Sequence, residues 1–92
     1  MKVNAKKITA QEEIRECLEG KSIYEMTVWT RDHAQYLKWF RGYDKTKIEA
    51  IMEPFMVIAF YMYENFKDDL KAIEDFRAFC VVCALELETN CE

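Results

Sequence analysis

The feature that most restricts the fold of this chain is a helical repeat of apolar residues in its second half. Between residues 46 and 66, apolar side chains recur every three or four positions, at Ile48, Ile51, Met52, Phe55, Ala59, Met62 and Phe66. An α-helix turns once in about 3.6 residues, so this spacing places them all on one face. Pro54 lies inside the repeat and disfavours helical geometry at Glu53. We therefore expect one long helix that bends at Pro54, or two helices that meet there.

Two segments have the spacing of a capping box, in which a hydroxyl and a carboxylate three residues apart bond to each other's backbone N–H. Thr9 and Glu12 predict the start of a short helix over residues 9–19, which Gly20 ends in a left-handed conformation. Thr46 and Glu49 predict the start of the long helix.

Two more helices complete the expected set. Thr30 or Asp32 can cap a helix that runs to about Arg41, where Gly42 follows as a stop. Asp68 and Asp69 place acceptors at the start of a last helix over residues 68–88. Its inward stripe is expected at Ile73, Phe76, Cys80, Cys83 and Leu87.

Residues 22–30 are the strand candidate of this sequence. Tyr24, Met26 and Val28 alternate with Glu25 and Thr27, and the segment is rich in β-branched and aromatic residues. Such a strand needs a partner, either residues 2–7 or the same segment of a second subunit. The alternative is that these residues add a helical turn.

Length and composition limit the architecture. The chain has 92 residues, of which 51% are hydrophobic, with only two Gly and one Pro. These values predict a single folded domain over residues 1–92. We expect a mainly α fold, a compact bundle of four or five helices, with at most one short β element near the N-terminus; α+β is the alternative. The 46–66 and 68–88 segments should form the central antiparallel pair.

Charge is distributed unevenly along the chain. The net charge is −4, but residues 1–47 hold ten Lys/Arg against seven Asp/Glu, which gives +3, and residues 48–92 hold three against ten, which gives −7. No apolar run is long enough for a signal peptide or a membrane span. With four cysteines that do not resemble a disulfide framework, we expect a cytoplasmic protein with free thiols.

Catalytic chemistry finds little support in the sequence. His33 is the only histidine, no catalytic or phosphate-binding motif is present, and we expect no catalytic residues and no cofactor. Cys80 and Cys83 have a CxxC spacing that can bring both sulfurs to one metal or to each other. A structural zinc needs four ligands, so we favour core packing for these thiols and keep a thiol or metal site as an alternative.

Residues 21–47 interleave basic and aromatic side chains. A nucleic-acid-binding regulator is the alternative function that this pattern suggests, because bases stack on aromatic rings while cations neutralise phosphates. The residues that would carry it are Arg31, Lys38, Trp39, Arg41 and Lys45. The net acidity of the chain counts against it.

The two C-terminal helices carry more apolar surface than one core requires. Beyond the inward stripes, apolar residues lie on a second face of each helix, at Met56, Phe60 and Tyr63 and at Ala78, Val81 and Leu85. Such faces favour interfaces. We expect a homodimeric protein-interaction module that binds a protein partner and acts without catalysis. A narrower hypothesis is an acidic inhibitor of a nucleic-acid-processing enzyme, of the kind found in phages and mobile elements.

Overall fold

The computed structural model describes residues 9–42 and 44–89, except for the side chains of residues 38–41, and all regular structure in this part is helical. The four helices are α1 (Ala10–Leu18), α2 (Ile23–Arg41), α3 (Lys45–Phe66) and α4 (Leu70–Thr89). The mainly α prediction is confirmed. The predicted pairing of residues 2–7 lies outside the described residues.

The predicted strand at residues 22–30 is wrong, because this segment forms the first half of α2. A capping box starts the helix: Glu25 N donates to Ser22 Oγ at 3.2 Å, and Ser22 N donates to Glu25 Oε1 at 2.9 Å. The buried residues of α2 recur at three or four positions, at Ile23, Met26, Thr30, Ala34 and Leu37. This helical spacing overrides the local alternation of polar and apolar residues.

The other helix ends agree in part with the sequence. The capping box of Thr9 and Glu12 is present, and Gly42 ends α2 with φ of 63°. The box predicted at Thr46 is not used. Asp44 caps α3 instead, and its carboxylate accepts a hydrogen bond from Thr46 N at 3.0 Å. Asp69 accepts from the backbone of the first turn of α4.

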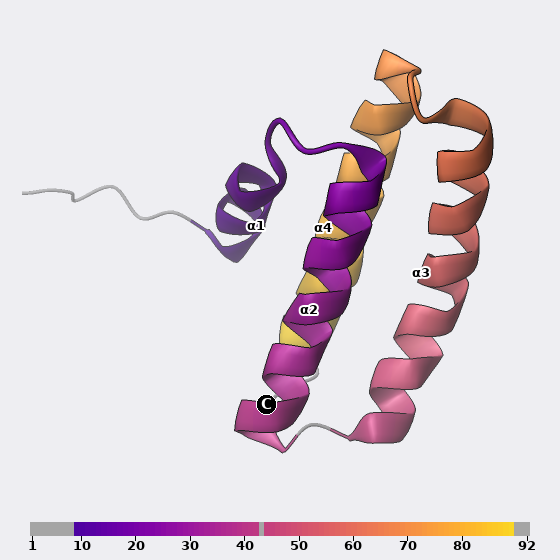
Figure 1. Cartoon of the computed structure of the whole chain (residues 1–92). Coiled ribbons are helices and arrows are strands. Elements are labelled where there is room, and N and C mark those ends of the chain that lie inside the picture. Colours follow the sequence, from indigo (N-terminus) through magenta and orange to yellow (C-terminus); the bar gives the residue numbers. More distant parts are fainter. Residues whose placement is uncertain (1–8, 43, 90–92) are drawn as a thin grey trace, which may run out of the picture.

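Pro54 does not divide α3, which continues from Lys45 to Phe66 (Figure 1). Proline at this position removes the hydrogen bond to the carbonyl of Ala50. Both residues are exposed, so water can satisfy that carbonyl. Of the two alternatives that the sequence left open, the structure has one long helix, and a division into two helices at Pro54 is wrong.

The helices α2, α3 and α4 lie side by side, with α3 antiparallel to both neighbours, and α1 packs against α4 (Figure 1). The sequence predicted α3 and α4 as the central pair. Of these two helices α4 is the central one, since it packs against each of the three other helices. Within α3 the fully or nearly fully buried side chains are Ile48, Phe55 and Ala59. The packing thus leaves α3 at one edge of the bundle with most of its surface exposed.

Candidate interaction surface on α2 and α3

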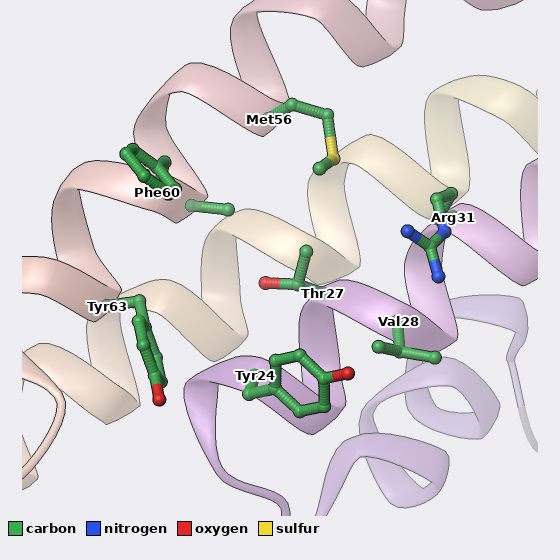
Figure 2. Close-up of a pocket in the computed structure, with 8 residues that line it drawn as sticks. Tyr24, Thr27, Val28, Arg31, Met56, Phe60 and Tyr63 are labelled. Atoms are coloured by element: carbon green, nitrogen blue, oxygen red, sulfur yellow. The ribbon is translucent and has the colours of Figure 1, made fainter.

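A shallow groove of about 250 Å³ separates α2 from α3. Figure 2 shows its lining, with Tyr24 and Tyr63 at one end and Arg31 and Met56 at the other. Thr27, Val28, Ala59 and Phe60 line it between these ends. The Tyr24 and Tyr63 rings are 6.3 Å apart between centroids and are tilted against each other. Apolar and aromatic groups therefore dominate the lining.

A second depression of about 280 Å³ continues this groove towards the start of α3. The two share Arg31 and Met56, and the second adds Ala34, Gln35, Lys45, Ile48, Glu49 and Met52. Lys45 Nζ lies 3.9 Å from Glu49 Oε2, and both side chains are well exposed. Arg31 makes no ion pair with any described residue. We call the two depressions together the α2–α3 groove.

The opposite side of α3 is also apolar. Val57 and Tyr61, four residues apart, share a face and are 66% and 57% exposed, and Ile58 is 40% exposed beside them. We call these three residues the outer patch of α3. The exposed surface of α3 is therefore apolar on both sides of its buried stripe.

The structure divides the six interaction residues predicted from the sequence. Met56, Phe60 and Tyr63 are exposed, and the structure brings them together in the α2–α3 groove. The second predicted patch is not a free surface. Ala78 is exposed, but Val81 is buried at 3% and Leu85 is half-buried against the main core. The predicted orientation of α4 is wrong at Val81, because α4 lies between α1 and the other two helices and buries more than one stripe.

The residues of the nucleic-acid alternative are only partly described. Arg31 and Lys45 line the same depression. The side chains of Lys38, Trp39 and Arg41 lie outside the described residues. Trp29, another aromatic residue of this region, is half-buried and stacks on His33 with 4.9 Å between ring centroids. That ring is therefore already occupied by a neighbour.

His33 connects α2 to α4. Its Nε2 lies 3.2 Å from Glu88 Oε2 but has no partner with hydrogen-bond geometry in the described part of the chain, so the two groups form an ion pair only when the imidazole is protonated. Burial lowers the pKa of His33, and the nearby carboxylate of Glu88 opposes this effect without overcoming it. The folded state therefore prefers the neutral imidazole.

This preference predicts a stability that falls with acidification. The unfolded chain binds the proton more readily than the folded one, so stability is complete above the unfolded pKa and is lost as the pH falls through the folded pKa. We expect a lower Tm at about pH 5.5 than at about pH 7, in the range where histidine is the side chain that titrates. Circular dichroism melts of wild type and His33→Gln measure the effect, which the variant should lack. A Tm that rises on acidification would mean that pairing with Glu88 dominates.

Cys80 and Cys83 are buried in the main core cluster. Burial raises the pKa of the Cys80 thiol to about 12 and that of the Cys83 thiol to about 11. A thiol with so high a pKa is a weak nucleophile at neutral pH. Among the described residues, no three His, Cys, Asp or Glu side chains converge on a site for a metal ion.

These thiols should differ from Cys17, which is exposed. We expect iodoacetamide to label Cys17 rapidly in the native protein, while Cys80 and Cys83 react only after denaturation, because the reagent needs an accessible thiolate. Peptide mapping by mass spectrometry assigns the label to each residue. Native labelling of Cys80 at the rate of Cys17 would contradict this prediction and would favour the thiol-site alternative.

The sequence did not identify the α2 residues that lie opposite Met56, Phe60 and Tyr63 in the groove. Tyr24, Thr27 and Val28, which form the α2 side of the groove, fell in the segment predicted as a strand. The outer patch was also missed. Its signal was present, since residues 54–63 are ten consecutive positions without a charge.

Comparison with known proteins finds no match to a protein family, to a curated protein or to a solved structure. The fold defines the class of this protein as a small, mainly α helical bundle. No described helix is both long and apolar enough to cross a membrane.

Proposed function

We propose that this chain is a protein-interaction module that forms a homodimer through the outer patch of α3. One observation carries the proposal: residues 54–63 hold no charged side chain, yet only Phe55 and Ala59 among them are buried. Exposed apolar area of this extent is costly in water, and a second molecule that covers it removes this cost.

A second copy is the favoured occupant because of the charge distribution. In a twofold symmetric interface the same patch meets itself, so any net charge in the patch faces a like charge. The second half of the chain carries −7, but the segment between Glu53 and Glu64 is neutral. This segment can therefore pair with its own copy without burying like charges.

The size of the patch predicts a weak dimer. The uncharged segment of ten residues, 54–63, is about 15 Å long, and a stripe about 10 Å wide along it offers roughly 150 Å². Stable interfaces bury about 800 Å² per partner. We therefore expect a dimer whose population depends on concentration in the micromolar range or above.

Analytical ultracentrifugation tests the dimer with a matched pair of variants. Val57 in the outer patch and Val82 on α4 are both exposed, at 66% and 61%. Val57→Lys should weaken the dimer by about tenfold or more, since it places two ammonium groups across the twofold axis. Val82→Lys adds the same charge elsewhere and should leave the dimer unchanged. Both variants should keep the wild-type Tm, because exposed substitutions cost about 0.5 kcal/mol or less.

Two results would overturn the proposal. One is a wild-type mass of 11.0 kDa at every concentration tested. The other is a dimer that Val57→Lys and Val82→Lys weaken equally, which would place the interface away from the outer patch.

A further inference from the structure

We propose that the α2–α3 groove binds an amphipathic helix of a protein partner, with apolar side chains along Met56, Phe60 and Tyr63 and a carboxylate against Arg31. This inference rests on the proposed role as an interaction module, but it does not require the dimer, because the groove and the outer patch lie on different sides of α3.

The form of the groove fits a helix. Two antiparallel helices form its walls, and on α2 it extends from Tyr24 to Gln35. Eleven residue steps at 1.5 Å make about 16 Å, or about three helical turns. An apolar groove of this length is the usual receptor in recognition of a helix through its side chains at i, i+3, i+4 and i+7.

The exposed groups of the groove supply the apolar contacts. Phe60 lines the groove from α3 and is 68% exposed, and Met56 and Tyr63 beside it are also exposed. Aromatic side chains in a partly formed pocket are frequent energetic centres of interfaces. A partner helix that covers Phe60 would therefore gain most of its affinity in this half of the groove.

The charges of the groove select an acidic partner. Its cations are Arg31 and Lys45, and Lys67 Nζ lies 5.6 Å from the centre of the Tyr63 ring at the other end. Glu49 is the acidic residue in the lining, and it pairs with Lys45. Arg31 makes no ion pair with any residue in the described ranges, so its guanidinium is left for a partner's carboxylate. A nucleic-acid strand would need a longer series of unpaired cations.

The test uses two synthetic helical peptides of about 14 residues, enough to span three turns. Both carry leucines at i, i+3, i+4 and i+7 in an Ala/Gln background. One has a glutamate a turn beyond the last leucine, and its twin has a lysine there. Fluorescence anisotropy gives the affinities, and backbone amide shifts from NMR locate the site. We expect shifts in residues that line the groove and a preference of about two- to fivefold for the glutamate peptide.

Three variants make the test specific. Arg31→Glu should reverse the preference between the peptides. Phe60→Ala should weaken binding of both by roughly tenfold. Tyr61→Ala is the control: it removes an exposed aromatic ring from the next residue, on the other side of α3, and should leave binding of both peptides unchanged.

Several outcomes would overturn the inference: no saturable binding below about 1 mM, equal effects of Phe60→Ala and Tyr61→Ala, or a preference that Arg31→Glu does not change. Binding of an oligothymidylate that Arg31→Glu abolishes, without peptide binding, would assign the groove to nucleic acid. Loss of the dimer in Val57→Lys with retained peptide binding separates this site from the homodimer interface.

Discussion

Replacing Val81 with lysine is expected to unfold the chain, whereas the same replacement at Val82 should leave Tm within a few degrees of wild type. Val81 is 3% exposed and belongs to the main core cluster, while the neighbouring Val82 is 61% exposed. A buried ammonium without an ion-pair partner costs several kcal/mol. The free energy of unfolding of a small domain is only about 5–15 kcal/mol, so this cost is a large part of it.

Thermal melts followed by circular dichroism measure this pair of variants, and the adjacent positions make Val82→Lys a control for added charge and for helix propensity. A folded Val81→Lys protein with the Tm of Val82→Lys would mean that α4 presents a different face to the core. If Val82→Lys unfolds the chain, Val82 is part of the core, and the face that α4 presents to the core again differs from the one described.

The helix pattern could be predicted from the sequence because its signals are local. The cap at Thr9, the stop at Gly42 and the stripe from Ile48 to Met62 each depend on residues a few positions apart, and the structure contains all three. The stripe is wrong at its last member, because Phe66 is exposed at the end of α3. The strand at residues 22–30 shows the limit of such signals. Residues 24–28 alternate between apolar and polar, which favours a strand. The helical period of the buried residues of α2 becomes clear only when Ala34 and Leu37 are included.

The second buried face of α4 could not be predicted, because it depends on where a distant helix packs. Arg77 Nε donates to the carbonyl oxygen of Leu18 at 3.3 Å, across 59 positions of sequence, and Arg77 Nη1 pairs with Glu74 at 3.1 Å. Arg77 is thereby buried beside α1. Helical spacing in a sequence predicts one inward face for each helix, and Val81 does not lie on the face predicted for α4.

Only the α3 side of the candidate site could be predicted, because the α2 side depends on how distant segments pack. Met56, Phe60 and Tyr63 follow a helical spacing on α3, and this spacing was sufficient to place them together. Their neighbours on α2 are set by the packing of α2 against α3. Arg31 was noted only as part of a basic region, and its position beside Met56 in an apolar groove is a property of the folded chain.

Phe55 should be the residue on which the attachment of α3 most depends. Its side chain is fully buried, and its ring centroid lies 5.7 Å from that of Phe76 and 5.5 Å from that of Phe79 on α4. Phe55→Ala removes these ring contacts and leaves a cavity, which costs about 3–5 kcal/mol. The free energy of unfolding from urea titrations measures this loss.

Phe60→Ala is the matched control, since it makes the same substitution five residues later on the same helix, at a side chain that is 68% exposed. It should cost much less, because little apolar area returns to water. Hydrogen exchange should show where the loss falls: α3 has few other buried anchors, so its amides should lose protection before those of α4 in the Phe55→Ala variant. Equal losses in both variants would contradict the packing described for α3. Unchanged protection in α3 would show that Ile48 and Ala59 are sufficient to hold it.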